Sequence, residues 1–172
     1  MPTIGVSIAV PEPFGAALQA FRVSLGDAPA RQIPTHITLV PPAEVAEDSL
    51  ERIEVHLRQA AALQQPFRVR LRGTGTFRPV SPVVFIGVVD GIAGCETLAA
   101  ATRSGPLAVE ARFPYHPHVT VAHDVASDQL DRAFSELAGF EADFEVDRFW
   151  LYVHDEEIGW RPTRAFELGR AP

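Results

Sequence analysis

Lysine is missing from this 172-residue chain, and cysteine occurs once. All fifteen basic residues are arginine, which excludes a lysine nucleophile and Schiff-base chemistry. Cys95 has no second cysteine with which to form a disulfide inside the chain, and we expect it to be a small core residue on a helix. A single free thiol is typical of a reducing compartment, so a cytoplasmic protein is expected.

Long apolar runs and excess positive charge are also lacking. No run approaches the roughly eighteen apolar residues that a membrane span needs, and the apolar start at Thr3 has no basic flank of the kind that precedes a signal peptide. We therefore expect no membrane partner. The formal net charge of −7 argues against a protein that coats long duplex nucleic acid, because such binding depends on many Lys and Arg contacts to phosphates. A small phosphate ligand or an RNA end stays compatible with this charge.

The 47% apolar content is ample for a buried core, and no Gly-, Ser- or Pro-rich linker divides the chain. Alternating and helical apolar spacings predict a series of strands and helices. The predicted strands are Thr3–Val10, Ile33–Val40 (ending at Pro41-Pro42), Phe67–Arg72, Val83–Val89, His118–Ala122, Phe144–Val153 and Trp160–Leu168. The predicted helices run from Phe14 to Leu25, from about Asp48 to Ala61 with Glu51 as a capping-box partner, from Ile92 to Arg103, and from a Ser127 cap to Leu137.

A histidine strand, a capped helix and two further strands occur twice in this order. The repetition predicts a single bilobal α+β domain over residues 1–172, made of two pseudo-symmetric lobes. Each lobe is expected to be an antiparallel sheet with helices on its outer face, and the active-site cleft is expected between the sheets. We expect the chain to act as a monomer.

Two short motifs carry the functional prediction. His36-Ile37-Thr38-Leu39 and His118-Val119-Thr120-Val121 both read His-apolar-Thr-apolar. In a strand, residues i and i+2 point to the same face, so each histidine shares a face with its threonine. From the composition we expect only ~0.07 such motifs by chance. One copy alone would not indicate a function, but two copies at equivalent places do.

The paired motifs match what cleavage of a phosphodiester requires. One imidazole takes a proton from the attacking oxygen while the other gives a proton to the leaving oxygen, and an ordinary pKa of about 6.5 suits histidine to both roles. Threonine hydroxyls can donate to the non-bridging oxygens. The residues predict His36 and His118 as catalytic and Thr38 and Thr120 as substrate-binding. They do not order the two histidine roles.

The two motifs, 82 positions apart, resemble the paired His-x-Thr/Ser-x motif of the 2H phosphoesterase superfamily. The preceding Phe113-Pro114-Tyr115-His116-Pro117 resembles its 2′-5′ RNA ligase-like branch, which includes RNA 2′,3′-cyclic phosphodiesterases. The resemblance implies two lobes around a cleft, no metal or other cofactor, and hydrolysis of a 2′,3′-cyclic phosphate or a related cyclic or 2′-5′ phosphodiester. It also implies that His36 protonates the leaving oxygen and that His118 activates water.

Four further residues are candidate substrate contacts. Arg68 and Arg70 alternate with apolar residues on one predicted strand, so they either face the cleft and meet phosphates or form a solvated stripe. Trp150 either stacks on a base or packs in the core, and Tyr115 is a weaker candidate of the same kind.

Three alternatives stay open. His116 and His118, with His36 or His123, have a spacing that could hold zinc in a metal-dependent hydrolase, although acidic ligands at recognisable spacing are missing. A second alternative is a binding module that recognises a nucleotide or RNA end without turnover. A third is an accessory protein, for which the sequence offers no large apolar stripe.

Overall fold

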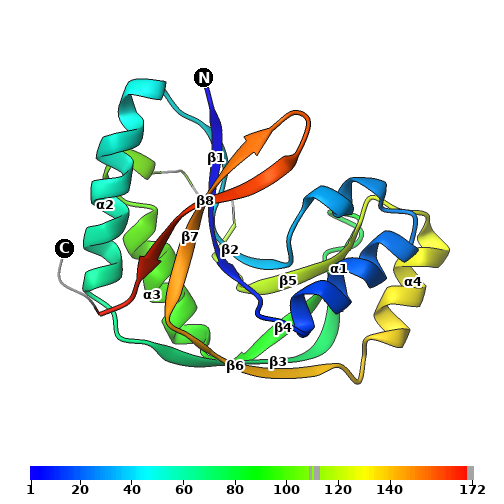
Figure 1. Cartoon of the computed structure of the whole chain (residues 1–172). Helices are drawn as coiled ribbons and strands as arrows, with labels where there is room; N and C mark the ends of the chain where they lie inside the picture. Colours follow the sequence, from blue (N-terminus) through cyan, green and yellow to red (C-terminus); the bar gives the residue numbers. More distant parts are fainter. Residues whose placement is uncertain (109, 111–112, 170–172) are drawn as a thin grey trace.

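The computed structural model describes residues 1–108, 110 and 113–169. Eight strands and four α-helices make up most of this part of the chain (Figure 1). The strands are β1 (Thr3–Ala9), β2 (His36–Glu44), β3 (Phe67–Thr76), β4 (Val83–Asp90), β5 (His118–His123), β6 (Glu141–Val146), β7 (Arg148–Asp155) and β8 (Gly159–Glu167). The helices are α1 (Phe14–Ser24), α2 (Leu50–Ala62), α3 (Ile92–Thr102) and α4 (Ser127–Glu136).

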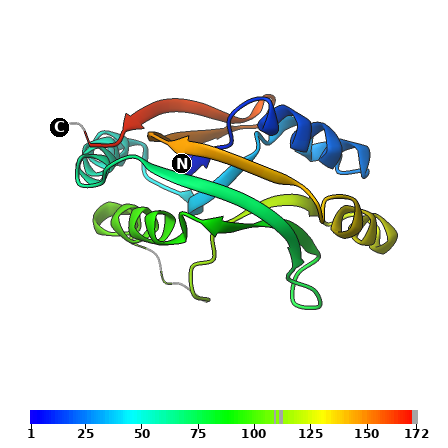
Figure 2. The same ribbon diagram turned by 90° about the horizontal axis from the view of Figure 1, so that it is seen from below.

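All eight strands belong to one sheet in the order β6-β3-β4-β5-β2-β1-β7-β8, and each neighbouring pair is antiparallel. The sheet curls, so that its two halves form separate layers when the molecule is seen from below (Figure 2). The predicted α+β class, with antiparallel strands and flanking helices, is confirmed. The two histidine strands, β2 and β5, are the neighbours at the middle of the sheet.

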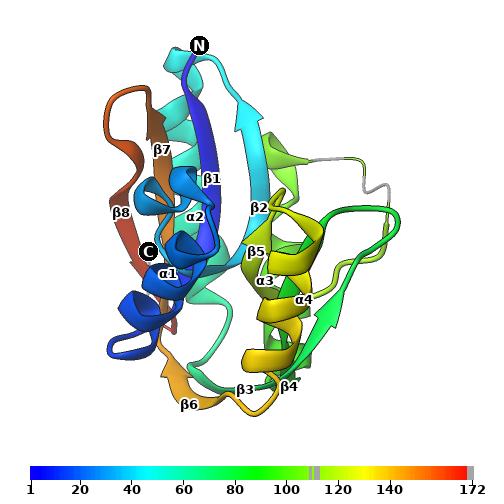
Figure 3. The ribbon, with the colours of Figure 1, turned by 90° about the vertical axis from the view of Figure 1, so that its right-hand side faces the viewer.

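The two halves of the sheet are not two consecutive halves of the chain. One half, β3 to β6, comes from the continuous middle segment, whereas β1 and β2 join β7 and β8 from the other end of the chain (Figure 3). The predicted strand Phe144–Val153 is accordingly wrong as a single element. It is interrupted at Asp147, where the chain leaves β6, which pairs with β3, and enters β7, which pairs with β1.

The helices lie in two pairs at opposite ends of the sheet, α2 with α3 and α1 with α4 (Figures 1 and 2). Helix α3 contacts β2, and α4 packs on β3, β4 and β5. Helix α2 turns an apolar stripe inward, as the 3.6-residue spacing predicts, and its buried side chains include Ile53 and Leu57. None of the helices in the described part of the chain is both long and apolar enough to cross a membrane.

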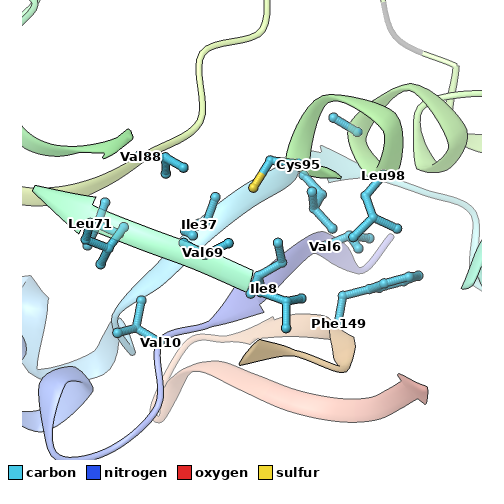
Figure 4. Packing of buried hydrophobic residues seen from close by; sticks show 14 of the residues in the cluster. Val6, Ile8, Val10, Ile37, Val69, Leu71, Val88, Cys95, Leu98 and Phe149 are labelled. Atoms are coloured by element: carbon cyan, nitrogen blue, oxygen red, sulfur yellow. The ribbon is translucent and has the colours of Figure 1, made fainter. Parts of the chain in front are cut away.

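One apolar core joins both halves of the sheet. Val69 and Leu71 of β3 lie in the same cluster as Ile8 of β1, Leu98 of α3 and Phe149 of β7 (Figure 4). All five are at most 2% exposed, and burying each such side chain stabilises the fold by about 1.5–3 kcal/mol. Because both halves contribute to this core, its packing stabilises their position relative to each other.

Three predicted boundaries differ from the structure, one at a proline pair and two at helix caps. Strand β2 continues through Pro41 and Pro42 to Glu44. The register with β1 shifts near these prolines, and β5 pairs with β2 only at Ile37. No hydrogen bond of the sheet therefore needs an N–H group from either proline. The predicted caps are also wrong. Residue Ser49, and not Asp48, precedes α2, Ser127 is the first residue of α4, and neither helix has a side-chain cap.

Candidate active site

The site is built where β2 meets β5. Ile37 is the direct cross-strand partner of Val119, and both side chains are fully buried in the core. Because successive residues of a strand point to opposite faces, the residues on either side of Ile37 and Val119 point to the opposite face of the sheet. The apolar residues of the two motifs therefore fix which way their polar residues point.

Two histidines and two threonines share this outer face. Continued by one residue on each side, the antiparallel register sets His36 opposite Thr120 and Thr38 opposite His118. Directly opposite side chains have Cβ atoms about 4.5–5.5 Å apart, and diagonal ones about 7–8 Å apart. Each histidine thus lies beside the threonine of the other motif, and the two histidines lie on a diagonal.

Small residues border both histidines on their other side. Ala9 of β1 is the cross-strand partner of His36, and Gly87 of β4 is the partner of His118. Neither neighbour has a side chain that extends beyond Cβ. These two strand neighbours therefore place no bulky side chain beside either imidazole.

A backbone carbonyl two residues earlier holds each imidazole in place. His36 Nδ1 lies 2.7 Å from the Pro34 carbonyl oxygen, and His118 Nδ1 lies 2.7 Å from the His116 carbonyl oxygen. A carbonyl oxygen only accepts, so Nδ1 carries the hydrogen in both rings. In the neutral form Nε2 then has the free lone pair, and in the protonated form it is the nitrogen that can release a proton to a ligand.

The pKa values of both histidines are lowered. For His36 the main cause is burial, which the Pro34 carbonyl partly opposes, and the charge of Arg22 lowers the pKa further. For His118 burial again dominates, the His116 carbonyl opposes it, and the His116 and His36 charges add to the lowering. Because the charge of His36 disfavours that of His118, the pair binds one proton more readily than two.

Aromatic rings surround His118. Its ring centroid lies 5.1 Å from that of Phe77 and 5.3 Å from that of Phe85, and the His116 ring lies 5.6 Å away. Phe85 is also the cross-strand partner of Thr120. These contacts restrict the orientation of the His118 ring together with the carbonyl of His116.

A cavity of about 330 Å³ opens over β2 on this face. This volume is at the lower end of the range of about 300–1,000 Å³ for small-molecule sites. Its lining contains three of the predicted site residues, His36, Thr38 and Thr120, and the register sets His118 beside Thr38. The other lining residues are Gly5, Ser7, Arg22, Ile33, Pro34, Val40, Pro42, Val83, His123, Tyr152 and Trp160.

Tyr115 reaches β2 from the segment before β5. Its hydroxyl donates to the backbone oxygen of Thr38 at 2.7 Å, and the Arg103 guanidinium lies 5.0 Å from its ring centroid. Burial raises the pKa of the Tyr115 hydroxyl, which keeps it protonated as a donor. The structure therefore places Tyr115 against the backbone of the site, while its predicted contact with substrate stays a prediction.

Arg68 and Arg70 lie apart from the cavity. Both are on β3, where Arg68 forms an ion pair with Asp143 and Arg70 lies 3.5 Å from Glu141, both on the neighbouring strand β6. These arginines are 62% and 42% exposed in their side chains. Neither lines the cavity over β2, and their predicted role in substrate binding stays a prediction.

Trp150 lines a second, smaller cavity of about 230 Å³. Tyr152 and Pro34 line both cavities, so the two are neighbours. Tyr152 and Trp160 are the aromatic residues that line the larger cavity, and the ring of Trp160 lies 3.6 Å from the place where a Cβ on Gly5 would be. Trp150 as a stacking residue stays a prediction.

The histidines considered for zinc are not gathered into a metal site. Within residues 1–108, 110 and 113–169, no three His, Cys, Asp or Glu side chains are arranged to hold a metal ion. His123 lines the large cavity but is exposed, whereas His116 packs against Phe77 and Phe85.

The chain thus belongs to the class of proteins in which a curled antiparallel sheet carries one histidine motif on each of its two middle strands. Comparison with known proteins gives the family. The family model of the 2′-5′ RNA ligase superfamily matches residues 10–157, and the chain belongs to this family. The resemblance inferred from His36-Ile37-Thr38-Leu39 and His118-Val119-Thr120-Val121 is thereby confirmed.

Similar proteins include bacterial relatives that are provisionally named as phosphoesterases. One from Geobacillus kaustophilus is 30% identical over 139 residues, which cover 80% of this chain and 80% of the relative. One from Oceanobacillus iheyensis is 29% identical over 140 residues, which cover 80% of this chain and 82% of the relative.

Two solved structures show the same fold. LigT of E. coli, crystallised with 3′-AMP, has a TM-score of 0.71 at 21% identity and covers 99% of this chain and 100% of its own. The protein TT0787 of Thermus thermophilus has a TM-score of 0.62 at 22% identity and covers 98% of each chain. The likeness extends over nearly the whole length.

Proposed function

We propose that this protein is a metal-independent phosphodiesterase that hydrolyses a 2′,3′-cyclic phosphate of a nucleotide or an RNA end, or a related 2′-5′ phosphodiester. The observation that carries the proposal is the pairing of Ile37 with Val119, which sets the two histidines and two threonines on one sheet face. Both Nδ1 atoms are bound to carbonyl oxygens, which leaves both Nε2 atoms for proton transfer.

The reaction needs one acid and one base on opposite sides of the phosphorus. His118 Nε2 accepts a proton from water while the water oxygen forms a bond to phosphorus. As the bond from phosphorus to one ribose oxygen breaks, the protonated His36 Nε2 gives its proton to that oxygen. The product is a nucleoside monophosphate, and the proton on His118 returns to His36 through solvent. The family resemblance assigns the two roles in this order.

The threonines bind the phosphate between the histidines. Thr38 and Thr120 present hydroxyl groups on the same face, and each can donate to a non-bridging oxygen. Donors that are already in place stabilise the charge that develops in the transition state without reorganisation.

The remaining cavity accommodates the nucleoside. Trp160 and Tyr152 form aromatic walls, and Ile33, Val40 and Pro42 supply apolar surface. Aromatic rings hold single-stranded bases by stacking, which depends little on base identity. The site is therefore suited to a mononucleotide or to the end of an RNA strand.

Turnover of nucleoside 2′,3′-cyclic phosphates by EDTA-treated protein tests the proposal. We expect activity to survive EDTA and kcat to fall by about 10²-fold or more in His36→Ala and in His118→Ala. His56→Gln is the matched control, because the ring of His56 lies 3.1 Å from the Thr102 carbonyl oxygen, between α2 and α3 and outside the cavity. Full activity in either alanine variant would refute the two-histidine mechanism.

A substrate panel separates the enzyme from a binding module. The panel contains the four nucleoside 2′,3′-cyclic phosphates and short 2′-5′ oligomers, with product regiochemistry determined by chromatography. Tight binding by calorimetry without any product would establish a module that recognises RNA ends. Product with a single regiochemistry supports the enzyme and identifies the bond that breaks.

A further inference from the structure

A buried ion pair lies at the edge of the large cavity. Arg22, in the last turn of α1, is 7% exposed, and its Nε donates to Asp27 Oδ2 at 2.7 Å; Asp27 is 6% exposed. Gly26, with a φ of 92°, turns the chain after the helix and lets Asp27 return to Arg22. An arginine is rarely buried to this extent unless it is paired, and here the pair fixes the guanidinium group.

Only one edge of the guanidinium group is used by this pair. Arg22 lines the same cavity as His36 and Thr38, and no described residue accepts a hydrogen bond from its two terminal nitrogens. Among the described residues, Gln64 Oε1 is the one fully buried side-chain polar atom that has no hydrogen-bond partner. The terminal nitrogens of Arg22 also have no partner, so they are not fully buried. Because Arg22 lines the cavity, these nitrogens reach its open space. They present donors in a fixed geometry to whatever fills it.

The cavity contains little other positive charge. Arg22 is the one permanently charged cation among the described lining residues. A phosphodiester carries one negative charge, the paired histidines share one proton, and threonine hydroxyls are neutral donors. A fixed cation beside the phosphate would add to the stabilisation of the transition-state charge, and an arginine fork matches two phosphate oxygens.

The electrostatics of His36 agree with this position. The charge of Arg22 contributes to the lowered pKa of His36, which requires the guanidinium group to lie within electrostatic reach of the imidazole. An anion that bridges the histidines is then also within reach of Arg22.

We infer that Arg22 is a third catalytic side chain, whose terminal nitrogens donate to a non-bridging oxygen of the reacting phosphate, and that Asp27 is its positioning residue. This inference rests on the proposed phosphodiesterase activity. It concerns the reacting phosphate and not an additional phosphate elsewhere on the substrate.

Charge-preserving and charge-removing variants test the inference. We expect Arg22→Gln to lower kcat on a nucleoside 2′,3′-cyclic phosphate by about 10²-fold, and Arg22→Lys, which keeps the charge but loses the fork, to lower it by about tenfold. Inhibition by inorganic phosphate should weaken at least tenfold in Arg22→Gln. Arg164→Gln removes one arginine that pairs with Glu54 outside the cavity and should leave both quantities unchanged.

In the Arg22→Gln variant the buried Asp27 carboxylate has no partner, which destabilises the fold. The double variant Arg22→Gln/Asp27→Asn removes both charges and is therefore tested as well. Thermal unfolding verifies that each variant is folded at the assay temperature. The same loss of kcat in the folded double variant supports the inference. Values of kcat and phosphate inhibition within twofold of the wild-type protein would overturn it.

Two further outcomes distinguish this inference from its premise. A loss confined to substrates that carry an additional 5′-phosphate would overturn the catalytic role, because Arg22 would then bind the additional group. If the wild-type protein turns over no cyclic phosphate, the proposed function fails. Phosphate binding by calorimetry that depends on Arg22 would still support the anion contact, and its absence would overturn that as well.

Discussion

Ile37 and Val119 are the one ladder pair between β2 and β5 in the described part of the chain, and through it the two histidine motifs lie side by side. A slip of one residue in either strand would turn its histidine and threonine into the core and its apolar residues into the cavity. Since both side chains are fully buried, such a slip is opposed by the whole core. The packing of two apolar residues thus sets the geometry of the four polar ones.

This pair should matter more to activity than its burial alone predicts. Ile37→Ala and Leu39→Ala both truncate a fully buried residue on the same face of β2, and each should lower the free energy of unfolding by about 2–5 kcal/mol. Of these two residues, Ile37 is the one paired with a β5 residue in the sheet ladder, so Ile37→Ala should reduce kcat several-fold more than Leu39→Ala. Urea titration and steady-state kinetics measure the two effects. Equal losses of kcat in the two variants would show that the Ile37–Val119 pair has no special role in activity.

The threonine hydroxyls should contribute to turnover more than to substrate affinity. Thr38→Val and Thr120→Val keep the shape of the side chain and remove the donor, and the loss of one such donor lowers kcat by about 10²–10³-fold in well-studied sites. We expect kcat to fall by at least tenfold in each variant while KM changes by less than threefold. Thr163→Val is the control, because Thr163 of β8 donates to the Leu151 carbonyl oxygen and lines neither cavity. An increase confined to KM would assign the threonines to ground-state binding.

Alternation in a strand predicts which side chains share a face but not what that face meets, since Arg68 and Arg70, predicted in the same way, lie apart from the cavity. In β2 and β5 the alternation of apolar and polar residues determines which side chains share a face, so His36 and Thr38 are predictable without a fold. Arg22 gives no such signal, because a polar residue on a helix is ordinarily solvated. Its role depends on the return of Asp27 after Gly26, which is a feature of the tertiary structure.

The interruption at Asp147 was not predictable for a related reason. Apolar residues continue on both sides of it, from Phe144 and Val146 to Phe149 and Leu151, so the local pattern reads as one long strand. The separate partners of β6 and β7 require the whole sheet order. The same long-range pairing explains why Arg68 meets Asp143, a residue 75 positions away.

The aromatic wall should determine the affinity for the nucleoside. Trp160→Leu keeps apolar volume and removes the stacking surface, and base stacking on an aromatic ring contributes about 1–3 kcal/mol. We expect KM for a nucleoside 2′,3′-cyclic phosphate to rise by about tenfold with little change in kcat. Trp150→Leu changes the second cavity alone and provides the comparison. A larger increase of KM in Trp150→Leu would place the base in the second cavity and restore the stacking role that the sequence predicted for Trp150.

The pH dependence of kcat/KM should follow from the two lowered histidine pKa values, since this quantity reports the free enzyme. Burial disfavours the charged form of His36 and of His118, so each loses its proton at a lower pH than an ordinary histidine with a pKa of about 6.5. The state with one proton on the pair is therefore most populated below pH 6.5, and we expect a bell-shaped profile with its maximum there.

A bound phosphate shifts this profile in the opposite direction. Its negative charge favours the protonated imidazoles and raises both pKa values, so the limbs of kcat should lie at higher pH than those of kcat/KM. In His36→Ala the acid is missing, and the residual activity should follow the single titration of His118. Initial rates between about pH 4.5 and about 8.5 in buffers of constant ionic strength measure both profiles. A maximum of kcat/KM above pH 7 would contradict the assignment of these two buried histidines as the acid and the base.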